Sequence, residues 1–153
     1  MIALLWIGCA GPAPAPPGPP APPGFACPEG ATHHAGDDDG LLVHTCNDTA
    51  GVRTGPHVGL RTDGSVAMEG AWQAGERHGA WTEWTADGAF RSLTTYASGI
   101  AEGPRREVGP DGRVLQLDMA GGEAVRMQVL PAQTPMPQWA DGQRGEGLRH
   151  AGP

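Results

Sequence analysis

Short runs of strand-forming residues alternate with glycine-containing turns through the middle of the chain. The clearest case lies between residues 75 and 98, where runs at 80–85 and 89–97 flank Asp87-Gly88. Asp-Gly between two such runs is a strong signal for a β-hairpin, because type I′ turns need positive φ at both central residues. The second run holds Phe90, Leu93 and Tyr96, which favour strands. We therefore expect a hairpin with a two-residue type I′ turn.

The same glycine skeleton occurs three times, at a spacing of 24 residues. Four columns of positions carry it: Gly51, Gly75 and Gly99; Gly55, Gly79 and Gly103; Asp63, Asp87 and Asp111; Gly64, Gly88 and Gly112. A fixed period of this length is typical of repeat architectures. We predict an all-β fold, a single-layer antiparallel meander of consecutive hairpins. Its repeats are 51–74, 75–98 and 99–122, with a degenerate repeat at 123–130.

The large side chains of the middle repeat are the candidate binding residues. In an unbulged hairpin with a two-residue turn, Trp84 and Leu93 share one face of the sheet. Trp81, Phe90 and Tyr96 then share the other face. These side chains form either a shallow core or an aromatic groove that binds a partner, and a thin sheet with few other large residues favours the core.

Composition fits a thin sheet better than a large core. Glycine and proline together make up 41 of the 153 residues, and the chain has no lysine and a net charge of −7. That charge argues against a nucleic-acid or anionic-membrane binder, which needs a positive surface. The chain also lacks a nucleophile-elbow serine, a lysine-containing phosphate loop and a Cys-x-x-Cys motif. We expect no enzymatic activity and no cofactor.

The N-terminus resembles the export signal of bacterial lipoproteins. An apolar run at 2–7, too short to span a bilayer, is followed by Gly8-Cys9. The resemblance implies a signal peptide at 1–8, lipidation of Cys9 and an outer-membrane location. Residues 10–24 are all Ala, Gly or Pro, so 9–26 is expected to be an extended spacer. The region 131–153, rich in Pro and Gly without periodicity, is expected to be a disordered tail.

With Cys9 assigned to lipid by that resemblance, Cys27 and Cys46 remain. An even number of cysteines in an exported chain favours a disulfide, which would close the N-terminal capping segment 27–50. Between them lie four candidate metal ligands: His33, His34, Asp37 and His44. The contiguous acids at 37–39 lack the alternating spacing of a calcium loop, so we favour a solvated turn. A metal-binding or metal-assisted hydrolytic protein is the alternative.

The middle repeat resembles the MORN (membrane occupation and recognition nexus) repeat, in its bacterial antitoxin-like variant. The matching residues are Gly79-Ala80-Trp81-Thr82-Glu83-Trp84, then Asp87-Gly88, Tyr96 and Gly99. The resemblance covers roughly 27–122 and implies a sheet that serves as an interaction or scaffold surface. We therefore expect a non-enzymatic module that binds a protein partner and touches the membrane only through its lipid. A toxin binder is one alternative, and a lipid-headgroup binder, which the net charge disfavours, is another.

Overall fold

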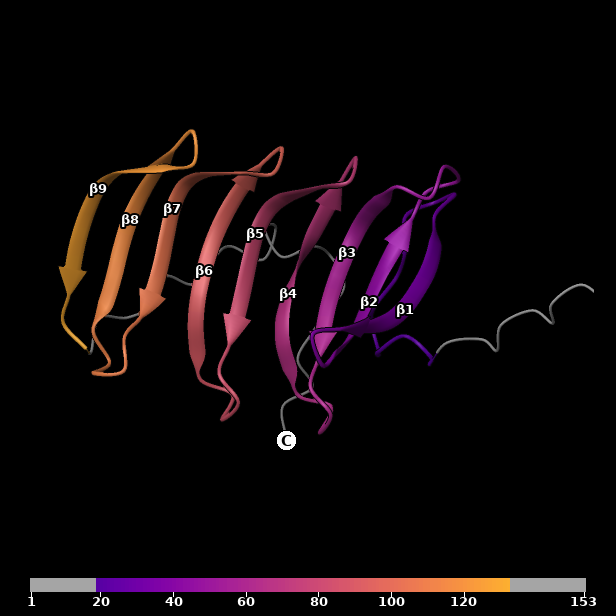
Figure 1. The fold of residues 1–153 in the computed structure, drawn as a ribbon, viewed down its shortest axis with the longest axis horizontal. Coiled ribbons are helices and arrows are strands. Elements are labelled where there is room, and N and C mark those ends of the chain that lie inside the picture. The colour runs from indigo at the N-terminus through magenta and orange to yellow at the C-terminus, as the bar shows by residue number, and fades with distance from the viewer. Residues whose placement is uncertain (1–18, 133–153) are drawn as a thin grey trace, which may run out of the picture.

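Nine consecutive strands pair in chain order into one open antiparallel sheet (Figure 1). The structure, a computed structural model, describes residues 19–132. The strands are β1 (Thr32–Asp38), β2 (Leu41–Asn47), β3 (Arg53–Leu60), β4 (Val66–Gln73), β5 (Glu76–Trp84), β6 (Phe90–Ala97), β7 (Ile100–Val108), β8 (Val114–Ala120) and β9 (Glu123–Leu130). The predicted all-β meander is confirmed. The signal peptide, most of the spacer and nearly all of the expected tail lie outside the described residues.

The repeats correspond to the pairs β3–β4, β5–β6 and β7–β8, and β9 occupies the degenerate repeat. Two further strands, β1 and β2, come from the capping segment. The expectation of a solvated turn at 37–39 is correct only for its last residue, because Asp37 and Asp38 are part of β1. Within residues 19–132 the structure has no helix with the length and hydrophobicity that crossing a bilayer requires.

The Asp-Gly pairs of the three repeats do not form the expected type I′ turns. In the middle repeat, the Gly88 N–H donates to the Thr85 carbonyl at 3.0 Å, and the Thr85 N–H donates to the Ala89 carbonyl at 2.9 Å. Gly88 has a φ of 79°, whereas Asp87 is not among the residues with positive φ. The Asp87 carboxylate instead accepts a hydrogen bond from the Ala89 N–H at 3.2 Å. This is a longer loop ending in a left-handed glycine, a common alternative to the two-residue turn.

Two-residue turns do occur, but at other positions of the period. Positive φ at both central residues, as type I′ turns require, is found at four places: Asp39-Gly40, Ala74-Gly75, Ser98-Gly99 and Gly121-Gly122. Within the repeats, the Asp-Gly loops therefore lie along one rim of the sheet. The two-residue turns at Ala74-Gly75, Ser98-Gly99 and Gly121-Gly122 lie along the opposite rim, whereas Asp39-Gly40, between β1 and β2, is on the same rim as those loops (Figure 1).

The remaining glycine column lies inside strands. Gly55, Gly79 and Gly103 have φ values of 72°, 69° and 81° within β3, β5 and β7. A register shift accompanies each one, in the pairings β2–β3, β4–β5 and β6–β7. Because left-handed backbone inside a bulged strand favours glycine, this column marks a bulge once per repeat.

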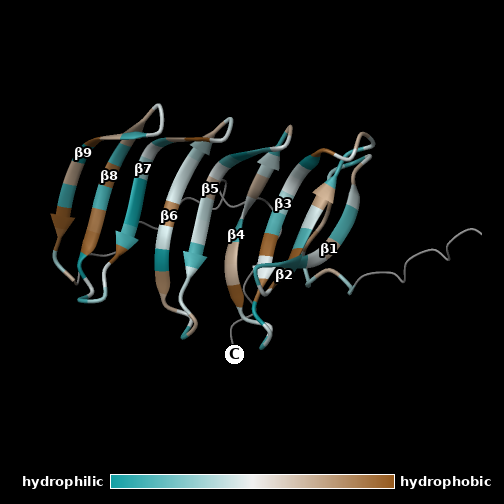
Figure 2. Cartoon of the chain, in the orientation of Figure 1, coloured by the Kyte–Doolittle hydropathy of each residue, from teal (hydrophilic) through white to brown (hydrophobic). Residues whose placement is uncertain are grey.

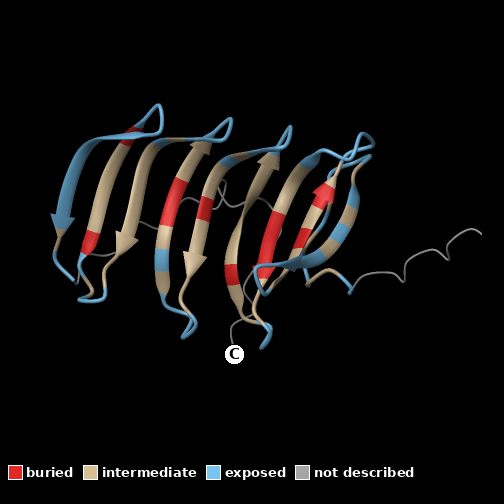
Figure 3. Cartoon of the chain, in the orientation of Figure 1, coloured by how far each residue is buried: buried red, intermediate tan, exposed pale blue. Residues whose placement is uncertain are grey.

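The buried core is small and is spread along the sheet from β2 to β8. The buried apolar residues are Cys46, Val58, Ala67, Trp81, Leu93, Val114 and Met119. These residues lie on β2 to β6 and on β8 (Figure 3), while β9 is almost entirely exposed. Apolar residues are likewise scattered over the strands and do not form one continuous layer (Figure 2). Each strand therefore depends mainly on its two neighbours, as in other repeat proteins.

Candidate binding surface: an arginine–aromatic row

Trp81 is the central side chain of one face of the sheet. It is only 5 % exposed, and its indole Nε1 donates a hydrogen bond to the Ala71 carbonyl at 3.1 Å. The ring lies over Gly70 of β4, where a Cβ would overlap it. The shift in register between β4 and β5 brings the ring to this position. Gly70 is thus a glycine whose role is to leave room for a side chain on the next strand.

Four rings form a connected cluster across β3 to β6, which we call the aromatic row: His57, Trp72, Trp81 and Tyr96. The Trp81 ring centroid lies 5.2 Å from those of His57 and Trp72. It lies 6.5 Å from that of Tyr96. The contacts of Trp81 with Trp72 and Tyr96 are edge-to-face, with interplanar angles of 81° and 80°, which suits the charge distribution of aromatic rings.

Two arginines lie over the row. The Arg53 guanidinium carbon is 4.8 Å from the centroid of Trp72. The Arg77 guanidinium carbon is 4.5 Å from the centroid of Trp81 and 5.5 Å from that of Tyr96. Arg77 also donates to the Tyr96 hydroxyl at 3.3 Å. Arg53 is exposed and Arg77 is half-buried, so this face presents planar cations stacked on rings.

His57 is a neutral packing residue in this row. Burial, followed by repulsion from Arg53 and Arg77, lowers its pKa from 6.5 to about 4. The side chain is 6 % exposed, and its Nδ1 is buried without a hydrogen-bond partner. An imidazole that stays neutral down to such low pH is poorly matched to acid–base catalysis at neutral pH.

The row consists of two copies of one triad, 24 residues apart. Arg53, His57 and Trp72 in the first repeat correspond to Arg77, Trp81 and Tyr96 in the second. The third repeat has Ala101, Arg105 and Ala120 at these positions, so the row ends at β6. Four members of this surface were not predicted from the sequence: Arg53, His57, Trp72 and Arg77. The same 24-residue alignment that revealed the glycines would have found them.

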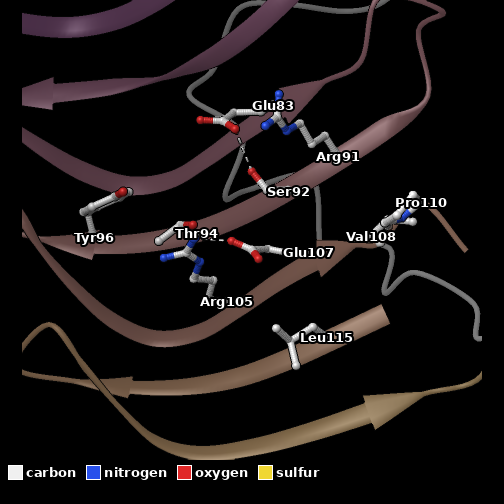
Figure 4. Close-up of a pocket in the computed structure, with 11 residues that line it drawn as sticks. Glu83, Arg91, Ser92, Thr94, Tyr96, Arg105, Glu107, Val108, Pro110 and Leu115 are labelled. Carbon is white, nitrogen blue, oxygen red and sulfur yellow. Dashed lines mark hydrogen bonds and ion pairs between the residues drawn. The ribbon is translucent and has the colours of Figure 1, made fainter. Parts of the chain in front are cut away.

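A shallow hollow of about 470 Å³ adjoins the row where the third repeat carries Arg105 in place of a ring (Figure 4). Tyr96 lines it at the end nearest the row. Its walls are mostly polar: Ser92 donates to Glu83 at 3.0 Å, and Arg105 pairs with Glu107. The hollow and the row together form a continuous surface of rings, arginines and polar groups over β3 to β8.

The candidate residues named from the sequence fall into two groups. Trp81 and Tyr96 lie together in the row, whereas Phe90 is paired with Trp84 on the neighbouring strand. A register shift between Glu83 and Trp84, with Arg91 as the extra residue, separates Phe90 from the row. The expectation that Phe90 shares a face with Trp81 and Tyr96 is therefore wrong, because it assumed an unbulged hairpin.

The four proposed metal ligands do not converge. His33 Nε2 lies 3.0 Å from His44 Nδ1, and the two rings are stacked. His34 follows His33 along β1 and so faces the other side of the sheet, and Asp37 is paired with Leu42 farther along. Between residues 19 and 132, no group of three or more His, Cys, Asp or Glu side chains is arranged to hold a metal ion.

The disulfide between Cys27 and Cys46 is present, as predicted. It joins the segment before β1 to β2, the second strand of the sheet.

Comparison with known proteins adds no identification: no protein-family model and no curated protein matches this chain.

Proposed function

We propose that this chain is the non-enzymatic interaction module of an exported bacterial lipoprotein and that it binds a protein partner through the arginine–aromatic row. The observation that carries the proposal is the stacking of Arg53 and Arg77 on a row of rings at one face of a thin sheet. Arginine and large aromatic side chains are the residue types most enriched at interaction hot spots. The adjoining hollow gives a partner side chain room to enter.

The chemistry of the row favours a partner segment with a carboxylate near an apolar or aromatic group. Arginine pairs well with carboxylates through its planar fork, and its stacked face remains available to a second ring. Tyr96, half-buried at the edge of the hollow, adds a hydroxyl beside the guanidinium of Arg77. A toxin is one class of partner that the resemblance to antitoxin-like repeats suggests.

Binding is tested by comparing variants that keep the sheet intact. The double variant Arg53→Gln, Arg77→Gln removes both cations and leaves the rings in place. The matched control is Arg113→Gln, since Arg113 lies in an exposed turn on a rim. After cross-linking and capture from cells that express the full chain, we expect the double variant to recover at least about tenfold less of the partner recovered by the wild type. Equal recovery by the double variant and the wild type would rule out the row as the binding surface.

The lipoprotein part of the proposal is tested separately at Cys9. It is supported by the Gly8-Cys9 pair, the Ala/Gly/Pro spacer that follows and a disulfide, which is most common in oxidising compartments. In a bacterial host, the wild type should incorporate labelled palmitate and fractionate with the outer membrane. Cys9→Ala should do neither, and label in Cys9→Ala equal to that in the wild type would contradict lipidation at this residue.

A further inference from the structure

The last strand of the sheet, β9, presents an unprotected edge. It pairs only with β8 among the described strands, so the backbone groups along its other side have no strand partner there. Seven of its eight residues are exposed, including Val125 at 67 %, Met127 at 69 % and Val129 at 58 %. Proteins usually blunt such an edge with charges, proline or short length. This strand has only two charged residues, Glu123 and Arg126, and no proline.

The opposite edge of the sheet is protected. There β1 carries Asp37 and Asp38 near its end, together with His33 and His34, and it has no large aliphatic side chain. A second acidic chain would meet like charges at this edge. The two edges are therefore not equivalent, and the apolar one is open to pairing.

We propose that the β9 edge pairs antiparallel with β9 of a second copy of this chain, which joins two sheets into one closed two-fold dimer. The inference is independent of the binding function proposed above. A two-fold contact uses the same patch on both copies, so it closes without forming a fibre. The protected β1 edges then lie at the two outer ends of the joined sheet.

The regular part of the β8–β9 ladder, residues 126–130, has Gln128 at its centre, so we place the two-fold axis there. Pairing centred on Gln128 places Met127 opposite Val129 of the second copy, and Arg126 opposite Leu130. These five positions form the regular part of the ladder with β8, beyond the register shift at its other end. The register centred on Arg126 would oppose two like charges, and that is destabilising.

Apolar side chains on β8 extend the contact. Met127 is paired with Leu117 and Val129 with Leu115, so these four residues share one face of the sheet. In the dimer, Met127 and Val129 of one copy contact the same residues of the other copy. The leucines of β8 lie beside them on the same face. On the other face, Arg126 keeps its ion pair with Asp118, at 3.6 Å.

The net charge of −7 does not prevent this contact. The acidic edge strand lies eight strand spacings from β9, or about 38 Å at ~4.8 Å per strand. At physiological ionic strength, interactions between exposed charges are screened beyond about 8 Å. Around the contact itself, Arg126 and Glu123 balance one another.

The first test measures the mass of the full chain in solution by sedimentation equilibrium. A mass of twice the 15.8 kDa of one chain supports the proposal, whereas a monomer at high concentration or a ladder of larger species overturns it. The double variant Met127→Lys, Val129→Lys should be monomeric, and Ile100→Lys should remain a dimer. Ile100 is a suitable control because it is 51 % exposed on β7, two strands from the outer edge of β9. A dimer that survives the double substitution would also reject the proposal.

The second test fixes the register. With Cys9 replaced by serine to remove competing thiols, Gln128→Cys should form a disulfide-linked dimer under mild oxidation. Thr32→Cys on β1 should not cross-link, although it should do so if chains associate through that edge. Cross-linking of Thr32→Cys, or none of Gln128→Cys, would contradict a dimer centred on residue 128.

Discussion

The second and third repeats share one backbone plan but hold it together by different means. At three equivalent positions, the second repeat has Arg77, Trp81 and Tyr96, whereas the third has an alanine, Arg105 and an alanine. The left-handed glycines of the bulge and the turn are kept in both repeats. The glycines therefore specify the path of the chain, and the stacked side chains stabilise it only where they occur.

Polar pairs replace rings in the third repeat. Arg105 pairs with Glu107, and Arg106 donates to the Gln116 side-chain amide at 2.8 Å. Both groups of the Arg105–Glu107 pair are more than a third exposed, so water screens their attraction. We infer that the sheet is more stable on the side of β3 to β6 than on the side of β7 to β9, and the following experiments test this difference.

The largest difference is expected between Trp81→Ala and Arg105→Ala, which alter the same position of two repeats. Trp81→Ala removes a buried ring and its contacts with three others, and should lower the free energy of unfolding by about 3–5 kcal/mol. Arg105→Ala should lower it by about 1 kcal/mol or less. Urea unfolding followed by circular dichroism measures both. Equal losses would show that the two repeats are equally important to stability.

The next effect is that of the disulfide, which stabilises the β1–β2 end. Cys27→Ala with Cys46→Ala removes a link across 19 residues. From loop-closure entropy, we expect the double variant to have a free energy of unfolding about 3 kcal/mol lower than the wild type. Hydrogen exchange should show faster opening of β1 and β2 and little change in β8. Uniformly faster exchange throughout the sheet would mean that this end is not an independent stabilising region.

A pH dependence is expected from His57. Its pKa is about 4 in the folded chain and 6.5 in the reference state, so the unfolded chain binds a proton first as the pH falls. Its contribution to stability is therefore complete above pH 6.5, is lost as the pH falls toward 4, and changes little below that. Between about pH 7.5 and pH 5 the loss should be about 2 kcal/mol, because the slope of ~1.4 kcal/mol for each pH unit applies only below pH 6.5.

Denaturant titrations of the wild type and of His57→Phe across this pH range measure that contribution. The variant keeps a ring in the row but cannot titrate, so its stability should fall less steeply with acid. The charged and titratable groups that affect the pKa of His57 are Arg53, Arg77, Asp38 and His44. His78→Gln is the matched control, because His78 is exposed on β5. Identical slopes for His57→Phe and the wild type would contradict the depressed pKa.

The smallest effect is expected at the Asp-Gly loops, which both regions share. The carboxylates of Asp87 and Asp111 accept backbone hydrogen bonds at 3.2 and 3.1 Å in equivalent loops. Asp87→Ala and Asp111→Ala should each lower the urea midpoint slightly, and Asp87→Ala somewhat more, because Asp87 also accepts a hydrogen bond from the Thr85 hydroxyl, whereas the equivalent residue of the third repeat is Gly109. A much larger shift at Asp87 would show that the loops, and not only the rings, contribute substantially to the difference between repeats.

The fold was predictable because the glycine period defines it directly. Three columns of glycine fix the bulges and turns, and strand-forming residues fill the space between them. The turn type was assigned to the wrong column, since Asp-Gly suits both a two-residue turn and a longer loop. The Asp87 carboxylate decides between them by bonding to the backbone two residues on.

The candidate site was only partly predictable. Trp81 and Tyr96 were evident because the chain has few large side chains. Their counterparts 24 residues earlier, His57 and Trp72, could be found from the same alignment. Which rings touch depends on the bulges, because each one shifts the register and changes which side chains share a face. The overlap of Trp81 with the space above Gly70 follows from such a shift, and strict alternation along the strands could not have located it.

The strictly sequential pairing of the strands also has a consequence for the order in which the chain folds. No described strand has to wait for a partner from a distant part of the chain, since each pairs with the strands immediately before and after it. During synthesis, which proceeds from the N-terminus, the chain can therefore form each hairpin as soon as its second strand has been made. At every stage the newest strand is a temporary edge that the next strand covers. Only β9, the last of the strands between residues 19 and 132, has no described successor to cover it.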